Sequence, residues 1–417
     1  MNETPDDIPG DTRGLPARAA ALDLLATALS RRAGLDEGLS HPALAALPPR
    51  DRAFARALVM ATLRHLGAID AVLQARLKKP PPERIVHVLR LGVAQLLVLK
   101  VPPHAAVGAT VDLAAAQKGG GAFKGLVNAV LRGLTREPPT LDDPELLAPT
   151  WLAARWRAAY GEAAARDIAA IIPREPATDL TIKATGETER SDQKGEVSSW
   201  PGFAEGLWWV QDASAAVPAR LLDVKPGQSA LDLCAAPGGK TLQLAAAGAT
   251  VTAVDRSAGR LKRVSENLAR TGLAAEVVAA EAAAWPDKRT FDAVLLDAPC
   301  SATGTFRRHP DVLWVASPAD IPKLAAVQAR LLDSAARRVK PGGRLVYCVC
   351  SLEPEEGEGQ VDAFLQRTPG FELEPAAPGE GGAPEASLRA DGALRILPHH
   401  REGGTDGFYV ARLRRTA

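Results

Sequence analysis

The chain has 417 residues, of which 46% are hydrophobic and 24% charged, and its formal net charge at pH 7 is +1. This composition is typical of a globular protein of two or three domains, and it excludes a wholly disordered, collagen-like or coiled-coil chain. No apolar run approaches the roughly 20 residues that span a bilayer, so no membrane partner is expected. The four cysteines are too few for a disulfide framework and predict a reduced, cytoplasmic protein.

The first third of the chain is helical in pattern. Residues 1–14 are polar and acidic and predict a disordered tail. From 15 to 137, apolar residues recur at helical spacing, for example over 126–134, and this predicts an all-α domain. Residues 17–137 carry seventeen Lys and Arg against eight Asp and Glu. This excess suits a polyanionic partner, and equally a solvated helical surface.

A transition region follows at 138–204, which we interpret as a linker and a small substrate-binding subdomain. Its proline-rich start leads into a helical pattern over 151–172, and the polar stretch 186–200 predicts a surface loop.

From 205 to 417, short apolar runs alternate with helical stretches. The runs are 230–234, 251–255, 276–279, 293–297 and 344–349. Such alternation predicts an α/β domain with a mostly parallel sheet covered by helices. Residues 374–392 are rich in Pro, Gly, Ala and Glu and predict an insert or flexible loop, and 408–413 could form a last edge strand.

The most distinctive segment is 231–241, Leu-Asp-Leu-Cys-Ala-Ala-Pro-Gly-Gly-Lys-Thr. A strand ends, small residues turn the chain, and a helix begins, which places the loop at the carboxyl edge of the sheet where α/β folds bind ligands. Gly238 and Gly239 let a ligand approach the backbone closely. Neither the phosphate-binding loop nor the dinucleotide fingerprint matches the glycine spacing. A tight turn without a ligand is the alternative.

Two acidic residues follow the next predicted strands. Asp255 is placed to accept hydrogen bonds from ribose hydroxyls, or to cap the helix that starts near Ser257. Glu281 can reach an adenine edge or remain solvated.

Two further strands lead into cysteine-bearing segments, Asp297-Ala-Pro-Cys300 and Tyr347-Cys-Val-Cys350. Their position on the same sheet edge suits methyl transfer to a pyrimidine. A thiolate that adds to C6 of cytosine gives C5 enamine character, and a hydrogen-bond donor near N3 stabilises the developing charge. Chemistry alone does not decide which thiol attacks. For Cys348 we prefer a buried apolar role over a metal ligand, and no metal is expected.

These segments closely resemble the Sun/RsmB (Fmu-like) family of RNA cytosine-5 methyltransferases over nearly the whole chain. The segments that carry the resemblance are 234–240, 297–300, 304–311, 347–356 and 405–409, and the basic helical half resembles a NusB-like RNA-binding domain at 90–96 and 124–131. The resemblance implies a Rossmann-like S-adenosylmethionine-dependent methyltransferase domain preceded by an all-α NusB-like domain.

The resemblance also assigns site residues. It implies that S-adenosylmethionine is bound by Cys234, Ala235, Ala236, Pro237, Gly238, Gly239, Lys240, Asp255, Glu281 and Asp297. It makes Cys350 the nucleophile and has Cys300 assist release of the product. We expect Asp297 to hydrogen-bond the target base and Lys240 to support the site electrostatically. The family usually has Thr where this chain has Val349.

Basic residues suggest how RNA is held. Arg307 and Arg308 follow the first cysteine loop and could bind phosphates beside the target base. The alternative is that Arg308, or His309 after it, packs against Asp311 as scaffold. Arg52 and Arg56 are one helical turn apart and could form a phosphate-facing stripe, although a solvated face is the alternative. Two neighbouring aromatic residues could stack on a base or pack in the core, namely Trp208 and Trp209.

We therefore expect a monomeric, cytoplasmic methyltransferase that acts through a covalent cysteine–C6 adduct on small-subunit ribosomal RNA or a small-subunit assembly intermediate. The same chemistry on transfer RNA or another RNA is one alternative. The other is a catalytically weak RNA-binding ribosome-assembly factor.

Overall fold

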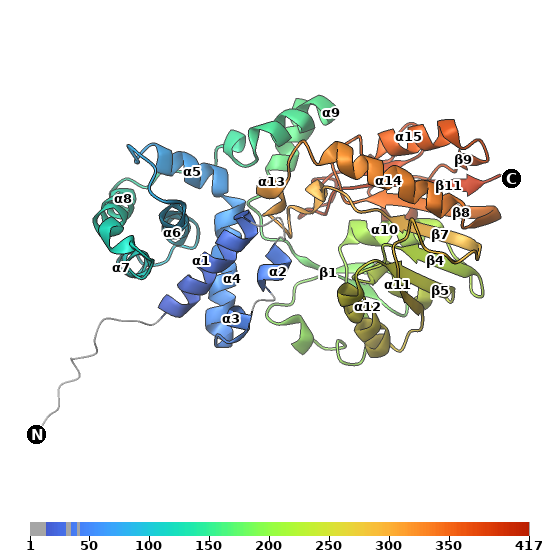
Figure 1. Cartoon of the computed structure of the whole chain (residues 1–417), viewed down its shortest axis with the longest axis horizontal. Helices are drawn as coiled ribbons and strands as arrows, with labels where there is room; N and C mark the ends of the chain where they lie inside the picture. The colour runs from blue at the N-terminus through green and yellow to red at the C-terminus, as the bar shows by residue number, and fades with distance from the viewer. Residues whose placement is uncertain (1–13, 31–34, 40–41, 417) are drawn as a thin grey trace, which may run out of the picture. The chain divides into compact units, whose positions relative to one another are not determined.

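The computed structural model describes residues 14–30, 35–39 and 42–416 (Figure 1). The predicted disordered tail therefore lies outside the described residues, apart from Gly14. The chain forms two compact units. One, the helical unit, takes in the chain up to Ala154 and also residues 309–315, and the other, the sheet unit, comprises 155–308 and 316–417.

The helical unit confirms the all-α expectation. Prolines lie at the starts of its helices, where the missing amide costs nothing, as Pro49 and Pro103 show. Its elements are α1 (Leu15–Ser30), α2 (Leu35–Leu39), α3 (Pro42–Ala45), α4 (Pro49–Arg64), α5 (Leu66–Gln74), α6 (Glu83–Val93), the π-helix η1 (Ala94–Val98), α7 (Pro103–Ala115), the 3₁₀ turns η2 (Gly120–Phe123) and η3 (Pro144–Leu146), α8 (Lys124–Arg136) and α13 (Val312–Val315).

Residues 309–315 join the helical unit although they lie between two elements of the sheet unit in sequence. Leu313 is fully buried. The Trp314 indole Nε1 donates a hydrogen bond to the carbonyl oxygen of Leu63 at 2.9 Å. The backbone amide of Leu35 donates to Asp311 Oδ2 at 2.9 Å. The boundaries at 137 and 204 stay a prediction, and the contacts within the chain divide it between Ala154 and Arg155.

The sheet unit contains a large sheet with the strand order β10-β11-β8-β7-β4-β5-β6, in which β9 also pairs with β11. Strands β4 to β8 run parallel, and β11 is antiparallel to β8, β9 and β10. The strands are β4 (Ser229–Leu233), β5 (Thr250–Asp255), β6 (Glu276–Ala279), β7 (Phe291–Asp297), β8 (Val339–Val349), β9 (Phe371–Leu373), β10 (Leu394–Ile396) and β11 (Phe408–Arg415).

Helices cover both faces of this sheet (Figure 1). Residues of α14 and α15 pack on one face of β7 and β8, and α10 and α11 pack on the opposite face. Both faces are therefore buried, which is why these strands are nearly continuous apolar runs. The helices of this unit are α10 (Ala213–Leu222), α11 (Gly239–Ala246), α12 (Ala258–Thr271), α14 (Ile321–Ala336) and α15 (Glu358–Arg367), with the 3₁₀ turns η4 (Val197–Ser199), η5 (Thr303–Thr305), η6 (Glu380–Gly382) and η7 (Glu385–Ser387). The predicted α/β domain is confirmed.

The transition region is more structured than predicted. Helix α9 (Thr150–Ala169) is broken at Gly161, whose φ of 84° is not helical. A small sheet of order β2-β1-β3 follows, built from β1 (Thr178–Ile182), β2 (Thr188–Ser191) and β3 (Trp208–Val210). The predicted surface loop at 186–200 was wrong for Thr188–Ser191, since β2 pairs with β1 across a hairpin, whereas residues 192–196 form an exposed loop as predicted.

Two expectations near the C-terminus were also wrong. Strand β11 is not an edge strand, because it lies between β8 and β10. The stretch 374–392 is anchored rather than loose, since Ala383 and Ser387 are buried and Arg412 forms an ion pair with Glu380.

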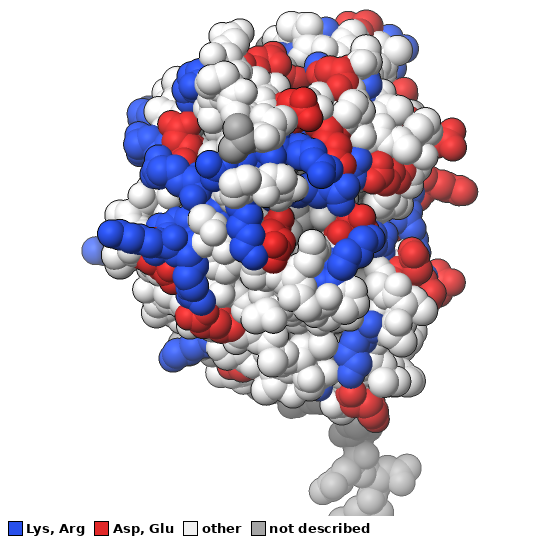
Figure 2. All heavy atoms as spheres, turned by 90° about the vertical axis from the view of Figure 1, so that its right-hand side faces the viewer, with Lys and Arg blue, Asp and Glu red and all other residues white. Residues whose placement is uncertain are grey.

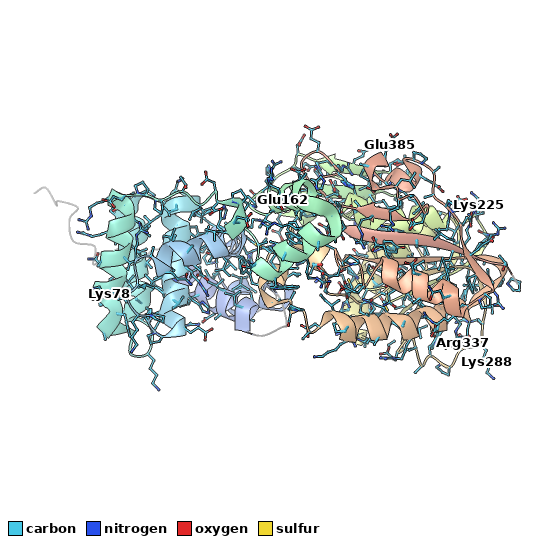
Figure 3. All side chains as sticks on the ribbon, turned by 90° about the horizontal axis from the view of Figure 1, so that it is seen from above. Lys78, Glu162, Lys225, Lys288, Arg337 and Glu385 are labelled. Atoms are coloured by element: carbon cyan, nitrogen blue, oxygen red, sulfur yellow. The ribbon has the colours of Figure 1, made fainter. Side chains whose placement is uncertain are left out.

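The parallel strands begin at the end of the sheet unit where Lys225, Lys288 and Arg337 project (Figure 3). On this face, Lys and Arg side chains gather into a band (Figure 2). Strand β8 carries two ion pairs near its start, Lys340–Asp292 at 2.8 Å and Arg344–Glu374 at 2.7 Å.

Among the described residues, no helix is both long and apolar enough to cross a membrane.

Candidate active site

The glycine-rich loop leaves the carboxyl end of β4 in a sharp turn. Cys234 has a φ of 62° and Gly238 a φ of 105°, both in the left-handed region. A Cβ atom at Gly238 would lie 3.1 Å from Val264 Cγ1, so the loop is packed closely against α12. Ala235 and Ala236 are buried. Residues 234–240 therefore form a compact strand-to-helix turn, as the sequence predicts.

Asp255 ends β5 beside this loop and is almost fully buried. Its Oδ2 accepts a hydrogen bond from the Ala236 amide at 3.1 Å, and its Oδ1 accepts from the Ser257 amide at 2.9 Å. The carboxylate thus ties the glycine-rich loop to the start of α12. Glu281 follows β6 and is exposed, which leaves its carboxylate accessible to a ligand.

Lys240 and Asp297 form an ion pair at the same edge of the sheet. The Lys240 Nζ to Asp297 Oδ2 distance is 2.7 Å, and Lys240 is 8% exposed. Burial lowers the pKa of Lys240, but the Asp297 carboxylate outweighs it and the net shift is upward, so the ammonium stays charged. The Cys348 thiol lies 3.5 Å from Asp297 Oδ1. The Asp297 carboxylate therefore contacts both Lys240 and Cys348 of the second cysteine segment.

The two candidate thiols are in contact. Cys300 follows β7 and Cys350 follows β8, which are adjacent parallel strands with Asp297 and Cys348 opposite each other. The Cys300 Sγ to Cys350 Sγ distance is 3.5 Å. The Gly304 amide donates to the Cys350 carbonyl oxygen at 3.0 Å and holds the two segments together.

The hydrogen bond to Cys350 raises the pKa of the Cys300 thiol well above its ordinary value, and burial raises it further. Cys300 therefore stays protonated at neutral pH and can donate a hydrogen bond to the Cys350 sulfur.

Asp232 on β4 is a site residue that our sequence analysis did not single out. It is fully buried, and its Oδ2 accepts a hydrogen bond from Thr241 Oγ1 at 2.6 Å. Its Oδ1 has no hydrogen-bond partner among the described residues. An unsatisfied carboxylate oxygen beneath the glycine-rich loop fits a ligand that brings a donor or a positive charge. The signal in the sequence was an acid inside an otherwise apolar strand.

The RNA-contact prediction for Arg307 was wrong. Its side chain is 1% exposed and forms ion pairs with Asp212 at 2.5 Å and Asp406 at 3.7 Å. A phosphate cannot reach a guanidinium that is buried against two carboxylates. Arg308 is 37% exposed and pairs with Asp406, so only part of its charge faces solvent.

The other side chains predicted to contact nucleic acid also differ in their exposure to solvent. Arg56 is exposed on α4, and Arg52 is partly buried, with its Nη1 3.3 Å from the Ala45 carbonyl oxygen. Trp208 and Trp209 of β3 are both buried, so neither is available to stack on a base. The Trp208 ring packs against the ring of Trp200.

No group of three or more His, Cys, Asp and Glu side chains in the described parts of the chain is arranged to hold a metal ion.

Comparison with known proteins agrees with this geometry. The sequence profile of the 16S rRNA methyltransferase RsmB/F family matches residues 219–414, and that of the NusB family matches residues 15–136. The ribosomal RNA small subunit methyltransferase B of Salmonella arizonae is 38% identical over 87% of this chain and 90% of its own length.

A second relative extends further along the chain. The protein of the same name from Pseudomonas syringae pv. tomato is also 38% identical, over 95% of this chain and 96% of its own. The fold matches the crystal structure of PH0851 with a TM-score of 0.78 at 24% identity, covering 98% of this chain and 99% of that one. From these matches and the paired thiols beside the glycine-rich loop, we conclude that the chain belongs to the RsmB/F family of 16S rRNA methyltransferases.

Proposed function

We propose that this protein methylates C5 of a cytosine in small-subunit ribosomal RNA, with Cys350 as the nucleophile. The observation that carries the proposal is the Cys300 Sγ to Cys350 Sγ contact of 3.5 Å, on the sheet edge that also bears the glycine-rich loop and the Lys240–Asp297 pair. A monomeric enzyme in the cytoplasm is part of the same proposal.

The cofactor of the family is S-adenosylmethionine, which supplies an electrophilic methyl group on a sulfonium when it is bound. The residues that would hold it are Cys234, Ala235, Ala236, Pro237, Gly238, Gly239, Lys240, Asp255, Glu281 and Asp297. The close-packed loop and the unpaired Asp232 Oδ1 fit such a ligand, because a buried carboxylate oxygen favours a cationic group.

Cys350 would add to C6 of the cytosine as a thiolate. The addition breaks the aromaticity of the ring and gives C5 the electron density of an enamine. Asp297 would hydrogen-bond the base by accepting from the amino group next to N3, and the Lys240 ammonium beside it would offset the negative charge that develops on the N3 side. A base in a duplex exposes neither carbon fully, so the target must be unpaired or flipped out.

Cys300 would act after methyl transfer. Its raised pKa keeps it protonated beside Cys350, so it can give its proton to the Cys350 sulfur as that sulfur departs from C6. The Cys300 thiolate that results can then take up the C5 proton, which restores the Cys300 thiol. Backbone phosphates of the RNA would be held by Arg308 on the sheet unit and by Arg52 and Arg56 on the helical unit.

RNA that contains 5-fluorocytosine tests this assignment. Release of the enzyme requires loss of a proton from C5, and fluorine at C5 replaces that proton, so the covalent adduct between the cysteine and C6 is trapped. We expect wild type to form the adduct, Cys350→Ala to form none, and Cys300→Ala to form an adduct that persists on ordinary RNA as well. Mass spectrometry of the trapped peptide identifies the attached residue. An adduct on Cys300 would reverse the two roles.

Two further outcomes separate the alternatives. Bisulfite mapping of ribosomal and transfer RNA from a deletion strain should reveal one missing 5-methylcytosine in the small-subunit RNA. If the missing 5-methylcytosine lies in transfer RNA instead, transfer RNA is the substrate. If the Cys350→Ala variant restores the wild-type phenotype to the deletion strain, the protein acts as an assembly factor rather than as an enzyme.

A further inference from the structure

A buried carboxylate that the mechanism above does not use lies between the two thiol segments. Glu356 belongs to the turn between β8 and α15 and is 0% exposed. Helix α15 begins at Glu358, and the turn before it carries Glu356 inward. The Tyr347 hydroxyl donates to the Glu356 carbonyl oxygen at 2.6 Å and fixes this turn to β8.

The donors to this carboxylate are the residues that directly follow the thiols. The Ser301 amide, next to Cys300, donates to Glu356 Oε1 at 2.9 Å, and the Ser301 hydroxyl donates to Oε2. The Ser351 hydroxyl, next to Cys350, donates to Oε2 at 2.5 Å. One carboxylate therefore bonds to both thiol segments.

A third residue that donates to Glu356 fixes the other side of Cys300. Gln328 on α14 is 0% exposed, and its Nε2 donates to Glu356 Oε1 and to the Pro299 carbonyl oxygen, both at 3.0 Å. Pro299 and Ser301 flank Cys300. The Cys300 segment is thus held before and after the thiol, through Gln328 and Glu356 together.

The placement of Glu356 has a cost that needs an explanation. Removing a carboxylate from water costs several kcal/mol, and an apolar side chain could fill the same space without that cost. The bonds described above come from neutral groups, namely an amide, two hydroxyls and a side-chain amide. Such bonds are directional, so they fix the relative positions of the segments that carry them, which apolar packing would not do.

We propose that Glu356 is a positioning residue that sets the contact between Cys300 and Cys350. It acts through Ser301 and Ser351 and does not itself touch the reacting atoms. Its catalytic consequence rests on the proposed function, because only a reaction that uses both sulfurs needs them at this distance. Its geometric consequence, the closeness of the two sulfurs, does not depend on the reaction.

The test compares Glu356→Gln with the neighbouring Glu355→Gln in the full-length protein. Glu355 is the matched control, since its side chain is 53% exposed and pairs with Arg155. The first readout is cross-linking of Cys300 to Cys350 by diamide, which takes two protons and two electrons from the thiol pair and leaves one disulfide. Peptide mass mapping follows its rate. The second readout is kcat and KM for RNA methylation.

We expect Glu356→Gln to bind S-adenosylmethionine as wild type does, to cross-link at least about fivefold more slowly, and to lose at least about tenfold in kcat with KM for RNA unchanged. Glu355→Gln should match wild type in both readouts. An unchanged cross-linking rate, an unchanged kcat, or equal losses in Glu355→Gln would each overturn the proposal.

If Glu356→Gln does not fold, as judged by loss of cofactor binding, Ser351→Ala replaces it. This variant removes one of the donors and should slow cross-linking and lower kcat at least about twofold, and wild-type behaviour would reject the proposal. If wild type itself methylates no cytosine, the proposed function fails, and the cross-linking rates alone then decide the role of Glu356.

Discussion

Asp232 shows how the environment of a single side chain sets its protonation. Burial, opposed by the hydrogen bond from Thr241 and the charge of Lys240, raises the pKa of Asp232 to about 7. An unfolded Asp titrates near 3.9. Between about pH 4 and pH 7 the folded protein therefore holds a proton that the unfolded chain has released. The stability due to this proton is complete at about pH 4 and is lost as the pH rises to 7.

The Asp232→Asn variant tests this. Asn keeps the acceptor for Thr241 but does not titrate. We expect the unfolding free energy of the cofactor-free wild type to fall relative to the variant between pH 5 and pH 7.5, by an amount on the order of 2 kcal/mol. Urea unfolding at several pH values measures the difference. Parallel stability curves for the two proteins would contradict the raised pKa.

Arg307 marks the limit of residue-scale prediction. A cation after a catalytic loop suggests a phosphate contact, but its charge is met by Asp212, which lies 95 residues away in sequence. Sequence gives the sign of a side chain and not the identity of its partner, since ion pairs form between segments that only the fold brings together.

At the scale of elements, η5 is the point where the first thiol segment meets β11. The Gly407 amide donates to the Gly304 carbonyl oxygen at 2.8 Å. A Cβ atom at Gly304 would lie 2.2 Å from the Gly407 carbonyl oxygen, which is backbone and cannot move aside without shifting β11.

We therefore predict that Gly304→Ala lowers the unfolding free energy by about 1–3 kcal/mol and abolishes methyl transfer. The second effect follows because the Gly304 amide also bonds to the Cys350 carbonyl oxygen. Thermal and urea unfolding, together with methyl incorporation into RNA, measure the two effects. In Gly359→Ala, the new Cβ would lie 3.4 Å from the Pro354 carbonyl oxygen, so this control should remain active and stable. Equal behaviour of the two variants would contradict the prediction.

At the scale of the whole molecule, residues 309–315 belong to the helical unit, although the segments on either side of them in sequence belong to the sheet unit. Trp314 packs against the core of the helical unit and donates a hydrogen bond to Leu63. We predict that Trp314→Ala destabilises the helical unit by about 2 kcal/mol, less than for a fully buried Trp. Hydrogen exchange should show faster exchange in α4 and α5, with β4 and β7 unchanged.

Trp285→Ala serves as the control for this prediction. Trp285 is buried in the core beside β7 and α14, so its removal should speed exchange in the sheet unit and leave α4 unchanged. If Trp314→Ala instead weakened protection mainly in β7, residues 309–315 would belong to the sheet unit.

Local patterns in the sequence were enough to predict the strands of the central sheet and the glycine-rich turn. The apolar runs 230–234, 251–255 and 293–297 predicted β4, β5 and β7, and Gly238 and Gly239 predicted the turn into α11. The sequence also predicted that both thiol segments lie on one edge of the sheet, because the carboxyl ends of parallel strands share an edge. The contact between the two sulfurs was not predicted. These features depend on residues that are close in sequence or on the rules of parallel sheets.

Tertiary structure alone decided the features that depend on distant pairing. It placed β11 inside the sheet, assigned residues 309–315 to the helical unit, buried Arg307 against acids, and turned Glu356 inward between Ser301 and Ser351. The physical reason is the same in each case. A polar or apolar residue needs a partner, and its sequence neighbours do not reveal which distant segment supplies that partner.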